Sequence, residues 1–253
     1  MDKSLLVSRF SKAIETYDDD AKIQQEVALQ MLDLLCPYCC SKIHKAVEIG
    51  CGTGFYSRLI ANTFQPEIFI LNDICHTMET MCNDIFSREN YTFIEGDAEV
   101  WDLPPNIDLL TSCSTFQWFQ HPARFFQKAY EKMNQNGIFA FSTYGNKNLD
   151  EVATLTGNAL PYNTLDELSE MLHNADFSII LAKEEIRTLV FKTPLDVLYH
   201  MKRTGINGVS SVAWTKETVR RFSEEYMDQF SNKNNEVILT YHPIYFIAKK
   251  QNV

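Results

Sequence analysis

The chain has 253 residues and is acidic, with 33 aspartates and glutamates against 23 lysines and arginines and a net charge of −10. This length suits one large domain or two small ones, and the 45% hydrophobic residues are typical of a globular protein. The charge argues against a nucleic-acid enzyme, which needs a broad basic face.

The sequence also bears on the compartment. No apolar run reaches the roughly 18 residues that span a bilayer. The first twenty residues contain no long apolar segment of the kind found in signal peptides. Seven cysteines at irregular spacing fit a reducing compartment better than a disulfide framework. We therefore expect a cytoplasmic protein.

Helices come first in chain order. Residues 4–35 repeat apolar side chains at steps of three and four, which predicts two helices. The segment "YDDDA" predicts a break between them, with Asp19 or Asp20 capping the second helix.

An alternating region follows these helices. Its apolar strand-like runs are Ala46–Ile49, Ile68–Leu71, Tyr91–Ile94, Ile107–Leu110 and Ile138–Phe141. Helix-like stretches lie between most of them, at 55–63, 76–88 and 122–134. Buried strands that alternate with helices predict an α/β fold, a parallel sheet with helices on both faces.

The last third of the chain changes pattern. Thr164 and Glu167 predict a capping box at the start of a helix over 164–175. One strand over 178–191, a polar helical insertion over 195–232 and one long strand over 237–250 complete the chain. We expect a single domain over 1–253. Its core is about 41–191 and 236–250, and its cover elements are 1–40 and 195–232.

A glycine-rich loop follows the first predicted strand. The segment "AVEIGCGTGF" contains Glu48, Gly50, Gly52 and Gly54. Nucleotide-type ligands bind outside the carboxyl ends of parallel strands, where the first loop turns into a helix. The dinucleotide fingerprint is G-x-G-x-x-G, whereas here the third glycine comes one residue early and an acid precedes the first. A carboxylate at that place favours a cationic ligand over a phosphate.

Asp73 ends the second predicted strand. In nucleoside-binding α/β folds an acid at this place accepts the ribose hydroxyls. The alternative is that Asp73 caps the following helix, and both roles are compatible.

These motifs resemble those of class I S-adenosylmethionine-dependent methyltransferases. The resemblance implies a Rossmann-like, mostly parallel seven-stranded sheet with a helical cover, and S-adenosyl-L-methionine as cofactor. It implies that Asp97 and Ala98 of "EGDAE" lie beside the adenine, and that "SCS" at 112–114 lies near the reacting sulfur. The cofactor-binding residues that it implies are Tyr17, Glu48, Gly50, Cys51, Gly52, Gly54, Asp73, Ile74, Met78, Asp97, Ala98, Ser112 and Cys113.

A narrower resemblance extends over nearly the whole chain. It rests on "SRFSKAIETYDDDAKIQQEVALQML", "FSTYGNKNLDEV", "LYHMKRTGINGVSS" and "LTYHPIYFIA". In this order, these segments are similar to segments of the malonyl-acyl-carrier-protein O-methyltransferases of biotin synthesis. Cys113 stands where asparagine is expected in that family. The resemblance implies methylation of the free carboxylate of malonyl-acyl-carrier protein. The implied partner is an acyl carrier protein that bears malonyl-phosphopantetheine, with neither nucleic acid nor a membrane.

The chemistry that the resemblance implies needs no general base, because carboxyl pKa values lie near 4 and the oxygen is already ionised at neutral pH. We therefore expect positioning residues rather than a catalytic dyad, namely Tyr17, Gln117, Trp118 and Tyr144. Selectivity for a free carboxylate calls for a cation or several donors. The cationic candidates are Lys202, Arg203 and Arg124. Simple packing for the aromatics and a solvated helix face for the cations stay open as alternatives.

Further basic residues lie in the predicted cover. Lys216, Arg220 and Arg221, together with 202–203, predict a landing patch for the acidic carrier protein. We expect His242, in the last strand, to be a buried histidine with satisfied hydrogen bonds rather than a ligand.

The segment "CPYCC" has the spacing of thiol–disulfide oxidoreductases. It follows a predicted helix instead of preceding one, so it lacks the electrostatics that lower a thiol pKa. Cys36, Cys39, Cys40 and His44 lack a second, separated pair of ligands, so we expect no metal site.

Two alternative functions remain at this point. One is a class I methyltransferase that acts on another small carboxylic acid, a quinone or an amine. The other is a non-catalytic cofactor-binding module.

Overall fold

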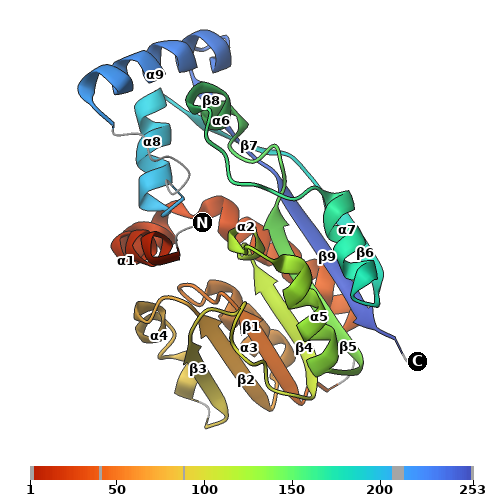
Figure 1. The fold of residues 1–253 in the computed structure, drawn as a ribbon. Coiled ribbons are helices and arrows are strands. Elements are labelled where there is room, and N and C mark those ends of the chain that lie inside the picture. The colour runs from red at the N-terminus through yellow and green to blue at the C-terminus, as the bar shows by residue number, and fades with distance from the viewer. Residues whose placement is uncertain (1–2, 40–41, 88, 207–213, 252–253) are drawn as a thin grey trace.

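A computed structural model describes residues 3–39, 42–87, 89–206 and 214–251 (Figure 1). Its centre is a seven-stranded sheet of order β3-β2-β1-β4-β5-β9-β6, in which only β9 runs antiparallel to its neighbours. The strands are β1 Lys45–Ile49, β2 Ile68–Asp73, β3 Tyr91–Glu95, β4 Ile107–Cys113, β5 Met133–Tyr144, β6 Phe177–Glu184 and β9 Pro243–Lys250. The predicted α/β fold, with its mostly parallel sheet, is confirmed.

Helices cover both faces of this sheet. The side chains of α2 (Lys22–Leu35) and α3 (Phe55–Phe64) pack in one hydrophobic core. Those of α5 (Pro122–Lys132) and α7 (Leu165–Asn174) pack in the other. Successive residues of a strand point to opposite faces, so both faces of β1 are apolar and bury Ala46 on one side and Val47 on the other.

A cover lies beyond the carboxyl ends of the parallel strands (Figure 1). It contains α1 (Lys3–Asp20), α8 (Pro194–Arg203) and α9 (Lys216–Phe230), with α1 packed on α8 and α8 on α9. A two-stranded antiparallel sheet of β7 (Arg187–Phe191) and β8 (Val237–Tyr241) joins these helices. The short helix α6 (Asp150–Thr156) packs on β8 and α9.

Two predicted long strands are wrong as single elements. The run over 178–191 divides into β6 and β7, and the run over 237–250 divides into β8 and β9 at His242. In each case one half belongs to the central sheet and the other to the cover. The buried ring of His242 fixes the second division, because its Nε2 lies 3.1 Å from Glu184 and its Nδ1 accepts from the Lys147 N–H at 3.2 Å. This confirms His242 as a buried histidine with satisfied hydrogen bonds.

The predicted cap of the second helix is also wrong. Helix α1 continues to Asp20, and Ala21 precedes α2 without a side-chain cap. The acid side chains serve tertiary contacts instead, because Asp18 accepts from Thr53 at 2.6 Å and Asp20 pairs with Arg203 at 2.6 Å.

The predicted helix over 76–88 is shorter than expected. It divides into α4 (Thr77–Met81) and the 3-10 turn η2 (Ile85–Ser87). Arg58 donates to the Met81 carbonyl at 2.7 Å and to the Asp84 carboxylate at 2.6 Å, which supports the chain where α4 ends. The remaining 3-10 turns are η1 (Cys36–Tyr38) and η3 (Phe116–Trp118).

The capping box before α7 is confirmed. The Glu167 N–H donates to Thr164 at 3.2 Å, and the Thr164 N–H donates to Glu167 at 2.8 Å. Cys40 and the 207–211 part of the "LYHMKRTGINGVSS" segment lie outside the described residues. Within the described ranges, no helix has both the length and the apolar character needed to cross a bilayer.

Candidate active site

A cavity lies between α1 and the carboxyl ends of the parallel strands. One face of α1 forms its roof, where Lys3, Leu6, Phe10, Ile14 and Tyr17 follow one another at steps of three and four. Its floor consists of the loops after four strands. The floor residues are Ile49–Thr53, Asn72–Ile74, Gly96–Ala98 and Cys113–Thr115.

Most of the predicted site residues meet in this cavity. Those that line it are Tyr17, Gly50, Cys51, Gly52, Asp73, Ile74, Met78, Asp97, Ala98, Cys113 and Trp118. Five others are not among the lining residues, namely Glu48, Gly54, Ser112, Gln117 and Tyr144. Of these, Gly54 precedes α3, the Ser112 hydroxyl donates to the Ile49 carbonyl at 2.8 Å, and Gln117 donates to the Ser114 carbonyl at 2.5 Å.

The glycine loop presents bare backbone to the cavity. Gly52 has φ +53°, a conformation that side chains disfavour, and a Cβ placed on it would meet no atom within 4 Å. Gly50 lies instead against Thr115, where a Cβ would approach the Thr115 hydroxyl to 2.2 Å. Gly52 therefore leaves room for a ligand, and Gly50 leaves room for the loop after β4.

Glu48 is a buried carboxylate beneath the glycine loop. It is 1% exposed, and its Oε2 has no hydrogen-bond partner among the described residues. Burial raises the pKa of Glu48 from its ordinary 4.5 to about 8. A buried carboxylate with a free oxygen is stabilised by a cationic partner.

Asp73 holds the loops on both sides of the cavity. Its carboxylate accepts from the Gly52 N–H at 2.9 Å and from the Cys75 N–H at 2.8 Å. Burial raises the pKa of Asp73, and these backbone donors oppose the rise. Carboxylate oxygens have about four acceptor positions in total, so the two backbone bonds leave capacity for a ligand.

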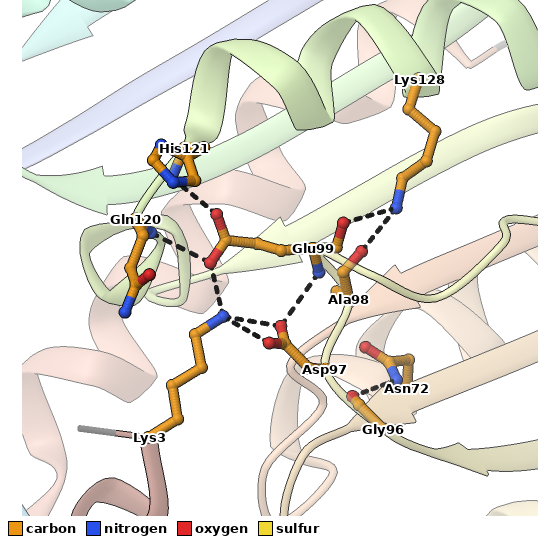
Figure 2. Close-up of polar contacts among 9 residues, drawn as sticks. All are labelled: Lys3, Asn72, Gly96, Asp97, Ala98, Glu99, Gln120, His121 and Lys128. Carbon is orange, nitrogen blue, oxygen red and sulfur yellow. Dashed lines mark hydrogen bonds and ion pairs between the residues drawn. The ribbon is translucent and has the colours of Figure 1, made fainter. Parts of the chain in front are cut away.

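An ion-pair network closes the cavity beside the loop after β3. Figure 2 shows Lys3 reaching from α1 to Asp97, at 2.7 and 2.6 Å from its two oxygens, and to Glu99 at 2.5 Å. Glu99 also accepts from the Gln120 N–H at 3.0 Å and the His121 N–H at 2.6 Å. Lys3 and Glu99 were not expected at the site, because neither lies in a motif and their meeting depends on how α1 folds back over the sheet.

A second lysine holds the same loop from the side of α5 (Figure 2). The Lys128 ammonium on α5 donates to the carbonyls of Ala98 at 2.8 Å, Glu99 at 3.1 Å and Trp101 at 2.6 Å. Asn72 donates to the Gly96 carbonyl at 2.9 Å. These side chains fix the backbone of the loop, so Asp97 and Ala98 face the cavity without a regular element of their own.

The loop after β4 has an unusual backbone. Ser114 lies at φ +57°, which is uncommon for a residue with a side chain and recurs at functional sites. Its hydroxyl donates to the Tyr144 hydroxyl at 3.3 Å. Cys113 lies 3.1 Å from the Ser142 hydroxyl, and burial raises the pKa of its thiol to about 12. Cys113 is therefore a neutral thiol in the wall.

The three predicted carboxylate-binding cations do not line the cavity. Arg203 pairs with Asp20 at 2.6 Å, whereas Lys202 and Arg124 are exposed. Among the described residues that line the cavity, Lys3 is the one cationic side chain, and Asp97 and Glu99 already pair with it. In the described part of the chain, no group of three or more metal-ligating side chains occurs.

Comparisons with known proteins place this geometry in a family. The family model described as "Methyltransferase domain" matches residues 47–141. A putative methyltransferase structure from Bacillus halodurans shares the fold, with a TM-score of 0.65 at 14% identity, over 87% of this chain and 99% of that one.

The full chain also matches curated relatives. It is 41% identical to the malonyl-[acyl-carrier protein] O-methyltransferase of Bacteroides thetaiotaomicron, and the match covers 100% of both chains. It is 44% identical to a protein of the same name from Bacteroides fragilis over 98% of this chain, which spans about half (51%) of that relative's length. The chain is therefore a class I S-adenosylmethionine-dependent methyltransferase and belongs to the malonyl-[acyl-carrier protein] O-methyltransferase family.

Proposed function

We propose that this protein methylates the free carboxylate of malonyl-acyl-carrier protein, an early step of biotin synthesis. The observation that carries the proposal is the 41% identity to a relative of that name over the full length of both chains. The substrate is not assigned from the fold alone, because this fold serves many acceptors.

The residues of the cavity suit S-adenosyl-L-methionine. The bare face of Gly52 offers close approach to the backbone, and the unpartnered oxygen of Glu48 offers an acceptor for an ammonium group. Asp73 retains acceptor capacity for ribose hydroxyls, and Ala98 gives an apolar wall beside Asp97. We assign the amino-acid end of S-adenosyl-L-methionine to Gly52 and Glu48, its ribose to Asp73 and its adenine to the loop at 96–98.

The reaction needs alignment rather than proton transfer. Bound S-adenosylmethionine supplies an electrophilic methyl group, so the carboxylate oxygen bonds to the methyl carbon as the carbon–sulfur bond breaks and sulfur keeps the electron pair. Helix α1 excludes water by covering the cavity, with Phe10 packed edge-on against Trp118 at 5.8 Å between ring centroids. Orientation of two reactants can account for about 7–11 kcal/mol of a barrier.

The outer surface of α9 is a candidate docking surface for the carrier protein. Lys216 is exposed at the start of α9, and Arg220 and Arg221 follow at steps of four and five, so all three extend from neighbouring parts of the helix surface. Two of them also form exposed pairs within the helix, Arg220 with Glu224 at 3.2 Å and Arg221 with Glu225 at 4.0 Å. Such exposed pairs are weak, so the arginines can exchange them for acidic groups of a partner.

The test is a transfer assay with labelled S-adenosylmethionine and malonyl-, succinyl- and acetyl-acyl-carrier protein. We expect transfer to malonyl carrier protein and none to the acetyl form, which has no free carboxylate. Cofactor binding without transfer to any of the three would instead support a different acceptor or a non-catalytic module.

A further inference from the structure

Among the described residues that line the cavity, the one cationic side chain, Lys3, lies far from Tyr17. Lys3 and Tyr17 both lie on the cavity face of α1, fourteen residues apart, which corresponds to roughly 20 Å along the helix axis. Lys3 is paired at its own end with Asp97 and Glu99. At the Tyr17 end, no lysine or arginine is among the described residues that line the cavity.

Neutral hydrogen-bond donors line the cavity beside Tyr17, together with the acids Asp18 and Asp73. The Tyr17 hydroxyl has no hydrogen-bond partner among the described residues, and burial raises the pKa of Tyr17, so this hydroxyl stays protonated. Ser114 contributes a second hydroxyl to the cavity wall, and its 3.3 Å bond to Tyr144 is long enough to be exchanged for a better acceptor.

Gln24 adds a third neutral group. Its side chain lines the cavity and is 8% exposed, its carboxamide hydrogen-bonds Tyr241, and its Oε1 has no partner among the described residues. A half-turn of the carboxamide exchanges this oxygen for two N–H donors, so Gln24 can present either to a ligand. A buried polar group of this kind costs stability unless a ligand completes its hydrogen bonds.

A wall of buried neutral side chains backs these donors. The Tyr241 hydroxyl lies 2.7 Å from His200 Nε2, and the Tyr144 and Tyr241 rings are 5.9 Å apart. Burial lowers the pKa of His200, which keeps its ring uncharged, and it raises the pKa of Tyr144 and Tyr241. The wall therefore carries no net charge at neutral pH.

We propose that Tyr17, Ser114 and Gln24 bind the substrate carboxylate as neutral donors, and that no lysine or arginine among the described residues pairs with it. This inference rests on the proposed function, because it concerns the acceptor of the same reaction. The counter-charge for the carboxylate is then the positive charge of the bound cofactor.

Neutral donors suit this reaction better than a fixed cation. The oxygen loses its negative charge as the ester forms, so a guanidinium beside it would stabilise the ground state more than the transition state. Hydroxyl and amide donors also orient the carboxylate, but they stabilise its negative charge less than a guanidinium does. They also select a free carboxylate over an ester, because the esterified oxygen no longer accepts hydrogen bonds as strongly.

The test compares donor variants with cation variants. The donor variants are Tyr17→Phe, Ser114→Gly and Gln24→Met, and glycine accepts φ +57° without strain. The matched cation variants are Lys202→Met, Arg203→Met and Arg124→Met. For each protein, KM and kcat are measured with a malonyl thioester, and the Kd of S-adenosylhomocysteine is measured by calorimetry. The Kd reports on folding and on the cofactor half independently of turnover.

We expect Tyr17→Phe and Ser114→Gly to lower kcat/KM roughly 10- to 100-fold, mainly through KM, and Ser114→Gly to leave the Kd of S-adenosylhomocysteine within threefold of wild type. Gln24→Met should also lower kcat/KM through a higher KM. The cation variants should keep KM and kcat/KM within twofold of wild type. The inference is overturned if either hydroxyl variant leaves KM within twofold, or if any cation variant raises it tenfold or more. If the wild-type protein methylates no malonyl thioester at all, the proposed function fails before this comparison begins.

Discussion

Two parts of the cavity are built in different ways. In the part proposed for the cofactor, here the cofactor end, the residues offer mainly backbone and acids, with Gly52 bare, Glu48 buried and Asp73 bonded to two backbone N–H groups. In the part proposed for the substrate, here the acceptor end, Tyr17, Ser114 and Gln24 present neutral side chains. The first set follows strands of one sheet, whereas the second comes from helices α1 and α2 as well as the loop after β4.

The strand-end loops are fixed by the sheet, whereas the residues supplied by the cover depend on where the cover packs. The parallel strands end at one edge, so the loops that follow them have to meet, and the backbone conformation alone creates much of the cofactor end. The acceptor end depends on how the cover is placed on the sheet. Substitutions at the cofactor end should therefore act directly on cofactor binding, and those at the acceptor end should act mainly on the acceptor.

The largest effect is expected for Gly52→Val. Valine at φ +53° is strained, and its side chain would enter the open space that Gly52 leaves. We expect the affinity for S-adenosylhomocysteine to fall at least about a hundredfold, or about 3 kcal/mol, in calorimetry.

Gly157→Val is the matched control for this variant. Gly157 has φ +66° and also faces open space, but it ends α6 away from the lining residues of the cavity. The backbone strain is therefore similar, and the ligand contact is absent. Equal loss of affinity in both variants would mean that strain, rather than a closed approach to the backbone, explains the effect of Gly52→Val.

Glu48 should give the cofactor-free protein an unusual pH dependence. Its pKa is about 8 in the folded protein and about 4.5 when unfolded, so between these values the folded state binds a proton that the unfolded state lacks. Stability therefore falls as pH rises through this window. We expect Glu48→Gln to remove about 2–3 kcal/mol of this decline between pH 5.5 and 7.5 in urea denaturation. An unchanged pH slope in the variant would show that Glu48 ionises normally.

The sequence predicts the sheet and its strand-end loops better than it predicts the cover. The sheet, the glycine loop and Asp73 follow from strand–helix alternation and from acids and glycines at strand ends. The divisions between β6 and β7 and between β8 and β9 do not, because apolar alternation continues through His242 and does not reveal which sheet a strand joins. The sequence also gives no sign that Lys3 reaches Asp97 across 94 positions.

The same reasoning covers the predicted cations. Arg203 and Lys202 follow each other on α8 and carry the right charge for a carboxylate, but a sequence does not show which way a cover helix turns. In the fold, Arg203 is held by Asp20 at the end of α1. Residue type alone therefore does not predict a partner, such as Asp20, that comes from a distant helix.

A moderate effect is expected from reversing the charges on α9. Lys216→Glu, Arg220→Glu and Arg221→Glu together should raise KM for malonyl-acyl-carrier protein by about tenfold and leave KM for a free malonyl thioester unchanged. The control with the same change in net charge places glutamates at the opposite edge of the sheet, at Lys42, Lys132 and Lys249. If the control raises KM equally, net charge and not the α9 surface guides the carrier protein.

The smallest effect is expected where α1 meets the loop after β3, in Lys3→Met. Lys3 is 20% exposed and ties α1 to Asp97 and Glu99, so the variant should loosen the roof without changing the floor (Figure 2). We expect S-adenosylhomocysteine to dissociate about three- to fivefold faster in stopped-flow measurements, since partly exposed ion pairs contribute about 1 kcal/mol or less. Salt at 0.5 M, an ionic strength of roughly the order that screens exposed pairs, should raise the dissociation rate from the wild-type protein towards that from the variant.

Lys12→Met, on the exposed side of α1, is the control and should release S-adenosylhomocysteine at the wild-type rate. Slower release in Lys3→Met would have the opposite meaning, that Lys3 competes with the adenine for Asp97, and α1 would then oppose the cofactor end instead of completing it.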